Sequence, residues 1–336
     1  MPKFLRAVVG LACLAALTCA GCSSGGTGST RSNASPSTPT AAVPGTSYAP
    51  YVSATTASAT DTSGSPSAYN LAFVISDGSG CTPKWDGGRD IADPAVKSRI
   101  AALTSSGAAV RVSFGGAAGT ELAAACDSAS GLARAYAAAL DAVGATRADF
   151  DIEGDALTDT GAVAKRSEAI ALLQRERTGL TVSYTLPVMP SGLDADSLAL
   201  LHSANDHGVK VSTVNVMTMN YGTTYTGDMG DYAIASAQAA HDQLQDVFAL
   251  SSDDAWHGLA LTSMIGDNDI AGETFTLSDA AQVRSFSEGK GLAWVSMWST
   301  FRDQQCEDGD TSSDDAATNC SGVSQSAGAF AQALSG

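Results

Sequence analysis

The sequence has 336 residues, of which 44% are apolar, and it carries a formal net charge of −17. This length suffices for one large domain or two domains of ordinary size. The acidity excludes nucleic acid as the expected partner, because a chain this negative repels phosphate backbones, whereas it would not repel a neutral polysaccharide.

The first residues have the pattern of a secretory signal. Lys3 and Arg6 form a basic start, and the apolar run over residues 7–17 is too short to cross a bilayer. Cys22 ends an Ala-Gly-Cys segment that is typical of a bacterial lipobox, in which the cysteine is acylated and becomes the mature N-terminus. The sequence therefore predicts a signal peptide over residues 1–21 and a lipid anchor, with simple cleavage and secretion as the alternative.

Residues 22–46 consist mainly of serine, threonine, glycine, proline and alanine, with almost no large apolar side chain. Such a segment cannot bury a core, so we expect a flexible tether that holds a folded domain clear of the membrane. We expect a monomer outside the cell or on the outer face of the membrane, which it contacts only through the anchor.

From residue 47 the sequence alternates between apolar strands and alanine-rich helices. The eight candidate strands cover residues 48–53, 70–76, 109–114, 148–153, 180–187, 210–221, 258–265 and 292–298. Candidate helices between them cover residues 94–107, 128–144, 161–179, 196–206, 232–250 and 278–288. The first crossover, residues 54–69, has no helical pattern.

Strands that alternate with helices predict an α/β fold with a parallel sheet. Two architectures compete, a closed (β/α)8 TIM barrel and an open doubly wound sheet. The count of eight favours a barrel over residues 47–336, and no Gly-x-Gly-x-x-Gly follows the first strand, as a dinucleotide-binding open sheet would require.

Three acidic residues alternate with two apolar ones in the fourth strand. Because side chains alternate across a strand, Asp149, Asp151 and Glu153 share one face while Phe150 and Ile152 share the other. Three carboxyl groups inside a barrel cannot all ionise, so at least one should hold a proton near neutral pH. Glu153 is nearest the carboxyl end, where barrel enzymes keep their active sites, and is the candidate acid.

Two other interpretations of this strand exist. The first is an exposed edge strand with solvated acids, which the two apolar residues argue against. The second is a calcium site with Asp155 and Asp159, but calcium ligands normally lie on a loop, not on a strand. We expect neither a metal nor another cofactor.

Four cysteines lie outside the signal region, at positions 81, 126, 306 and 320. An even number in an exported chain suggests two disulfides, for which three pairings are possible. Proximity in the sequence favours Cys306 with Cys320, which leaves Cys81 with Cys126. Metal ligation is the alternative, although no Cys-x-x-Cys supports it.

At the acidic strand the chain resembles the family 18 chitinases, whose signature is Asp-x-x-Asp-x-Asp-x-Glu on the fourth barrel strand. The last three acids are present as Asp149, Asp151 and Glu153, whereas Thr146 occupies the first acidic position. Further similarities lie at residues 48–51, 113–116, 217–221, 264–269 and 296–303, so the resemblance covers roughly residues 47–320.

The resemblance implies substrate-assisted retention, in which the N-acetyl group of the substrate replaces a protein nucleophile. Glu153 would protonate the glycosidic oxygen, and Asp151 would turn toward the acetamido N–H while Asp149 shares a proton behind it. Tyr221 would donate a hydrogen bond to the acetamido carbonyl, and Trp298 would stack under the sugar. Both aromatic residues could instead be ordinary core residues.

The same resemblance assigns further substrate-binding residues. Its third-strand and sixth-strand motifs place Ser113, Gly115, Gly116, Met217, Met219 and Asn220 at the substrate. Asn220 stands where aspartate is more common, and an amide cannot titrate, so any acid or base role there is lost.

The implied activity is hydrolysis of β-1,4-linked N-acetylglucosamine polymers or oligomers, that is, of chitin. The expected partner is therefore a polysaccharide or oligosaccharide that contains N-acetylglucosamine. An endo-β-N-acetylglucosaminidase acting on glycans would use the same acid motif. A barrel that binds N-acetylglucosamine or chitin without cleaving it is the other alternative, because a fold does not guarantee its activity.

Overall fold

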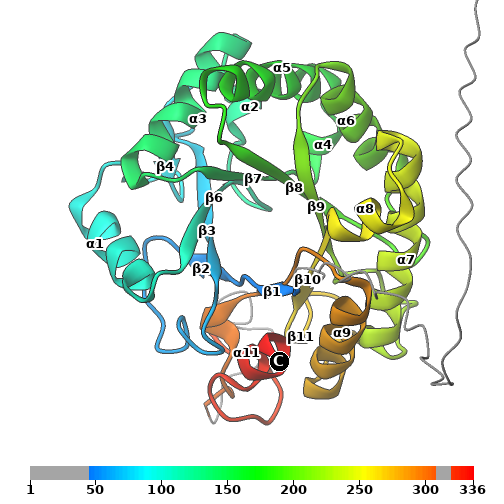
Figure 1. The fold of residues 1–336 in the computed structure, drawn as a ribbon. Coiled ribbons are helices and arrows are strands. Elements are labelled where there is room, and N and C mark those ends of the chain that lie inside the picture. The colour runs from blue at the N-terminus through cyan, green and yellow to red at the C-terminus, as the bar shows by residue number, and fades with distance from the viewer. Residues whose placement is uncertain (1–44, 308–318) are drawn as a thin grey trace, which may run out of the picture. The chain divides into compact units, whose positions relative to one another are not determined.

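The computed structural model describes residues 45–307 and 319–336, which form a closed barrel of parallel strands inside a ring of helices (Figure 1). The barrel strands are β1 (Ser47–Tyr48) with β2 (Tyr51–Ser53), β3 (Ala68–Ser76), β6 (Ala109–Gly115), β7 (Arg147–Asp151), β8 (Thr181–Pro187), β9 (Val211–Met217), β10 (Leu259–Met264) and β13 (Trp294–Trp298). They match the eight candidate strands, and the predicted (β/α)8 barrel is confirmed.

The first barrel strand closes the sheet in two pieces. β1 pairs in parallel with β13, and β2 pairs in parallel with β3. The break lies at Pro50, which has no N–H to donate. Even there the hydrogen bonds continue, because Ala49 N donates to the oxygen of Val295 (3.0 Å) and Asn70 N donates to the oxygen of Pro50 (2.9 Å). The continuous pairing excludes the open sheet.

The described residues contain the six predicted outer helices and one further outer helix, α11, which was not predicted. They are α1 (Pro94–Leu103), α3 (Ala129–Val143), α5 (Thr160–Glu176), α6 (Ala195–Asp206), α7 (Met229–Phe248), α9 (Leu277–Lys290) and α11 (Ala329–Ser335). Asp93 caps α1 by accepting hydrogen bonds from two backbone N–H groups, and the left-handed Gly144 ends α3. One end differs from the prediction: α5 stops at Glu176 with Arg177 as its cap, before Gly179. The first crossover forms turns without a helix, as expected.

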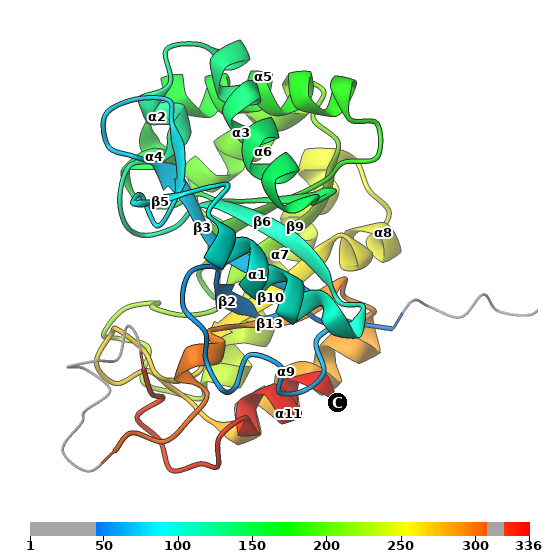
Figure 2. The same cartoon turned by 90° about the vertical axis from the view of Figure 1, so that its left-hand side faces the viewer.

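Short elements that the sequence did not reveal lie in the connections between barrel elements. They are two hairpins, β4 (Pro83–Trp85) with β5 (Arg89–Asp90) and β11 (Gly266–Asp267) with β12 (Thr274–Phe275), and three helices, α2 (Leu122–Ala125), α4 (Asp155–Thr158) and α8 (Ser252–His257). In the side view of Figure 2, β5, α2 and α4 lie on the same side of the barrel. These three elements follow the carboxyl ends of strands β3, β6 and β7, where barrel enzymes place their active sites.

The acidic strand has the predicted orientation. Phe150 faces outward, where its ring stacks on Phe114 at 5.3 Å and meets Tyr136 of α3 at 5.0 Å. Phe150 and Ile152 are fully buried, so the side chains between them point into the barrel. The strand ends at Asp151, two residues earlier than predicted, so Glu153 lies on the chain that leaves the barrel. Gly154, with φ of 54°, begins the turn into α4.

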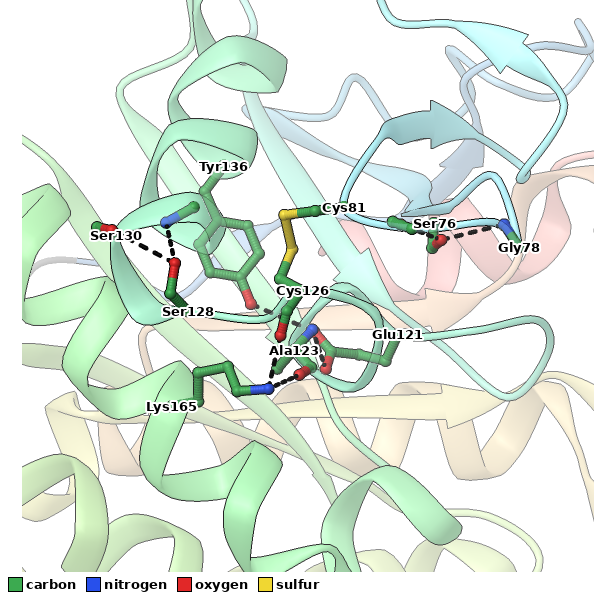
Figure 3. Close-up of a disulfide and its surroundings, with 12 residues drawn as sticks. Ser76, Gly78, Cys81, Glu121, Ala123, Cys126, Ser128, Ser130, Tyr136 and Lys165 are labelled. Carbon is green, nitrogen blue, oxygen red and sulfur yellow. Dashed lines mark hydrogen bonds between the residues drawn. A yellow bond between two sulfur atoms is a disulfide. The ribbon is translucent and has the colours of Figure 1, made fainter.

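Two disulfides join the pairs that proximity favoured, Cys81 with Cys126 and Cys306 with Cys320. Figure 3 shows the first of them, which connects the loop after β3 to the end of α2. Beside it, the Lys165 ammonium donates hydrogen bonds to the carbonyl oxygens of Cys126 (2.6 Å) and Ala123 (3.0 Å). This segment is therefore held from two sides.

The predicted signal peptide, the anchor at Cys22 and the tether up to residue 44 lie outside the described residues. Within the described residues, no helix has the length and apolar character needed to cross a membrane.

Candidate active site

A cavity of ≈ 510 Å³ opens where the carboxyl ends of the barrel strands meet. Six of the residues that the sequence singled out line it, namely Asp151, Glu153, Met217, Met219, Asn220 and Trp298. A second cavity of ≈ 190 Å³ adjoins the first and shares Glu153, Met217, Met219 and Asn220 with it. The cleft therefore continues on both sides of Glu153, with room for more than one unit of a linear polymer.

Asp149 lies beneath the cavity and is only 1% exposed. Four hydroxyl groups donate hydrogen bonds to its carboxylate: Tyr51 (3.0 Å) and Ser113 (2.7 Å) to Oδ2, and Ser183 (2.7 Å) and Thr185 (2.9 Å) to Oδ1. A carboxylate can be buried when both of its oxygens are hydrogen-bonded. The donors come from β2, β6 and β8, so Asp149 joins three strands at this level of the barrel.

Asp151 and Glu153 form a pair joined by a side-chain hydrogen bond. Burial, together with the charges of Glu153 and Asp149, raises the pKa of Asp151 well above its ordinary value. Burial also raises the pKa of Glu153, while the bond from Asp151 lowers it and the charge of Asp269 raises it. The two carboxyl groups therefore share a proton near neutral pH.

One oxygen of Asp151 is left unused. Its Oδ1 is buried and has no hydrogen-bond partner among the described residues. A buried carboxyl oxygen without a partner costs free energy, and a ligand N–H that reached it would recover that cost.

A buried cation lies below Asp149. The Arg111 guanidinium stands 4.0 Å above the ring of Trp294 and donates a hydrogen bond to Asn70. Burial lowers the pKa of Arg111 to about 10, and the negative charge of Asp149 opposes that shift. Arg111 is two residues from Ser113 on the same face of β6, so it lies inside the barrel. A single arginine in an apolar strand was the available signal, and sequence reasoning missed it.

Trp298, at the end of β13, is partly exposed and forms an aromatic wall of the cavity. Its ring stacks on Phe73 with centroids 5.5 Å apart, and the edge of Tyr51 approaches to 5.7 Å. Such a plane suits the C–H face of a sugar ring. Phe73 and Tyr51 also line the cavity and were not among the predicted site residues.

Gly115 and Gly116 support the site through the backbone and do not line the cavity. A Cβ on Gly115 would lie 2.1 Å from the carbonyl oxygen of Asp151, and a Cβ on Gly116 would lie 2.9 Å from the Phe73 ring. Gly116 N donates to that same oxygen of Asp151 (2.9 Å). The two glycines therefore let β6 approach β7 closely. The prediction that they bind substrate stays a prediction, as it does for Ser113, whose hydroxyl donates to Asp149 beneath the cavity.

Tyr221 does not reach the cavity. It is 5% exposed, its hydroxyl accepts a hydrogen bond from Ser236 of α7 (3.2 Å), and its ring packs against Tyr225 and Tyr232. The chain turns at Asn220, whose φ of 54° is left-handed, so Asn220 faces the cavity and the next residue faces the helix. The expected contact of Tyr221 with substrate has no support in this geometry.

Two further acidic or polar positions have plain structural roles. Thr146, which occupies the first acidic position of the signature, is exposed at the start of β7, and its carbonyl accepts the N–H of Thr181. Asp159 of the calcium alternative caps α5 through its carboxylate. Within the described ranges, no group of three or more His, Cys, Asp or Glu residues could hold a metal ion.

Comparison with known proteins gives a consistent result. The chain is 34% identical over 277 residues to a probable bifunctional chitinase/lysozyme of Escherichia coli K12, covering 76% of this chain and 31% of that protein. It is 33% identical over 276 residues to endochitinase 11 of Metarhizium anisopliae, covering 76% and 52%. The chain thus spans no more than about half the length of these curated relatives. No family model matches.

A solved structure agrees over nearly its whole length. It is the active domain 2 of a thermostable chitinase from Pyrococcus furiosus, determined as catalytic-site mutants in complex with chito-oligosaccharides. It is 28% identical, with a TM-score of 0.75, and the match covers 87% of this chain and 94% of that one. In sequence and in fold, this chain is similar to these chitinases.

The chitinase-like barrel should not tolerate a side chain at position 115. Gly115→Ala would place its Cβ against the carbonyl oxygen of Asp151 and would adopt a φ of 103°, so β6 must move away from the acidic strand. Gly107→Ala is the matched control, because its φ is 90° but no atom lies within 4 Å of the added Cβ. The control should lose about 1–2 kcal/mol of unfolding free energy in urea, and Gly115→Ala should lose more. Equal losses would contradict the close approach.

Proposed function

We propose that this chitinase-like barrel hydrolyses β-1,4-linked N-acetylglucosamine polymers or oligomers by substrate-assisted retention, with Glu153 as the general acid. The observation that carries the proposal is the proton-sharing pair of Asp151 and Glu153 at the bottom of the cavity. A carboxyl group with a raised pKa can donate a proton near neutral pH, which an ordinary glutamate cannot.

In the first step Glu153 donates its proton to the glycosidic oxygen. The acetamido oxygen of the same sugar forms a bond to the anomeric carbon as the bond to the glycosidic oxygen breaks, so the leaving sugar departs as an alcohol. In the second step water attacks the anomeric carbon of the resulting oxazolinium ion and gives a proton back to Glu153, while the bond from that carbon to the acetamido oxygen breaks and restores the acetamido group. The two inversions retain the configuration. This scheme uses one acid and no carboxylate nucleophile, unlike most glycosidases.

Asp151 orients the acetamido group in this scheme. Its unpartnered Oδ1 can accept the acetamido N–H, and rotation away from Glu153 would bring it there. The negative charge of Asp149, fixed by four hydroxyl groups, lies behind it and favours the positive charge of the oxazolinium ion. Trp298 supplies the plane under the sugar ring.

We expect Glu153→Gln to lower the release of a chromophore from an N-acetylglucosamine oligomer by about 10²–10⁴-fold. The amide keeps the shape of the side chain but has no acidic proton, so oligomer binding, measured by calorimetry, should persist. Asp155→Asn is the control, because Asp155 is exposed two residues further on and lines neither cavity. Wild-type turnover in the Glu153 variant would contradict the assignment of the acid.

We also propose that the protein is exported and held at the outer face of the membrane by a lipid on Cys22. The basic start, the apolar run and the Ala-Gly-Cys segment support this proposal, and residues 23–45 would serve as the tether. Cells fed a labelled fatty acid should incorporate the label into the wild type but not into Cys22→Ser. Label in both proteins, or in neither, would contradict it. A monomer is expected and can be tested by light scattering.

A further inference from the structure

Asn220 and Asp269 join two neighbouring loops at the cavity. Asn220 Nδ2 donates to Asp269 Oδ2 (3.1 Å), and the backbone N–H of Asp269 donates to Asn220 Oδ1 (3.1 Å). Both residues are exposed and line the same cavity as Glu153. An aspartate at position 220 could still accept the hydrogen bond from the backbone N–H of Asp269. It could not donate a hydrogen bond to the Asp269 carboxylate, and its negative charge would repel that carboxylate. The unusual asparagine is therefore the partner that a carboxylate at position 269 requires.

Asp269 is one of several carboxyl groups that surround Glu153. Asp151 faces it from β7 and Asp269 from the loop after β10, while Asp86 lies on the β4–β5 hairpin and Asp194 at the start of α6. No lysine, arginine or histidine lines either cavity within the described part of the chain. Burial and the charge of Asp269 raise the pKa of Glu153, whereas the hydrogen bond from Asp151 lowers it.

A buried cation also interacts with Asp269. Arg302 of η2 (Thr300–Arg302) is fully buried and donates a hydrogen bond to the carbonyl oxygen of Asp267 (2.6 Å). Burial lowers the pKa of Arg302 to about 10, and the charges of Asp269 and Asp267 oppose that shift. The Asp269 carboxylate therefore interacts electrostatically with a buried guanidinium and with the proposed acid.

We propose that Asp269, held by Asn220, is a positioning residue that keeps the proton on Glu153. The carboxylate that affects the pKa of the acid is that of Asp269, on the loop after β10. The amide of Asn220, in the sixth-strand motif, holds this carboxylate in place. The two hydrogen bonds keep the charge at one place, and a bound sugar that displaces water would strengthen its effect on Glu153. This inference rests on the proposed function, because it concerns the same acid.

Asp269→Asn tests the charge with little change of shape. The amide oxygen can still accept from Asn220, and the backbone N–H is unaffected, so only the negative charge is lost. The double variant Asn220→Asp/Asp269→Asn returns a carboxylate to the pair, with donor and acceptor exchanged. Asp194→Asn is the matched control, because Asp194 lines the adjoining cavity and asparagine preserves its cap on α6.

The measurement is the pH dependence of kcat/KM on a chromogenic N-acetylglucosamine oligomer. The acid must be protonated to act, so activity falls as the pH rises through the pKa of Glu153. Loss of the Asp269 charge removes one cause of the raised pKa. The falling limb of Asp269→Asn should therefore move to lower pH, the double variant should move it back toward the wild type, and Asp194→Asn should leave it in place.

Three outcomes would overturn the inference in an active protein: an unmoved limb in Asp269→Asn, an equal shift in Asp194→Asn, or no recovery in the double variant. A carboxyl-carbon NMR titration of glutamate-labelled protein gives a second readout, with the Glu153 signal assigned by its loss in Glu153→Gln. It does not depend on turnover. A wild type that does not cleave the oligomer would refute the proposed function, whereas an unshifted Glu153 titration in Asp269→Asn would refute this inference alone.

Discussion

The burial of three carboxyl groups, those of Asp149, Asp151 and Glu153, along β7 and the residues just after it constrains the residues that surround them in this barrel. The three carboxyl groups are stabilised in different ways. Asp149, the deepest, receives four hydroxyl hydrogen bonds and lies above the buried Arg111. Asp151 and Glu153 have no such donors and share a hydrogen bond, which requires a proton on one of them. The burial that would destabilise an ordinary core thus raises the pKa of the two carboxyl groups at the cavity.

Several features that look independent follow from this arrangement. The hydroxyl donors to Asp149 come from β2, β6 and β8, so those strands must present small polar side chains inward. β6 must also approach the end of β7, which requires Gly115. The proposed role of Asp269 extends the arrangement upward, where a second buried arginine, Arg302, faces a second carboxylate. Each end of this series of carboxyl groups thus has a buried arginine, Arg111 beside Asp149 and Arg302 beside Asp269.

The sequence was sufficient for the barrel, because its strands are separated by clear helix caps and the acidic strand alternates without error between two faces. It was also sufficient to place Glu153 and Trp298 at the cavity, because both lie at or just after the carboxyl end of a barrel strand. It did not predict the orientation of Tyr221, because the left-handed turn at Asn220 breaks the alternation on which a strand argument depends. It also missed Asp269 and the donors Tyr51 and Thr185, whose importance comes from pairing between distant strands. Local patterns do not carry that information. The close approaches at Gly115 and Gly116 were not predicted for the same reason.

We infer that Asp151 and Glu153 share a proton near neutral pH, while the Asp149 carboxylate accepts hydrogen bonds from four hydroxyl groups. Neutron diffraction from a deuterated crystal at neutral pH would test it most directly. We expect a deuteron between the Asp151 and Glu153 carboxyl oxygens, and four hydroxyl deuterons directed at Asp149. A pair without a deuteron, with both carboxyl groups ionised, would contradict the account.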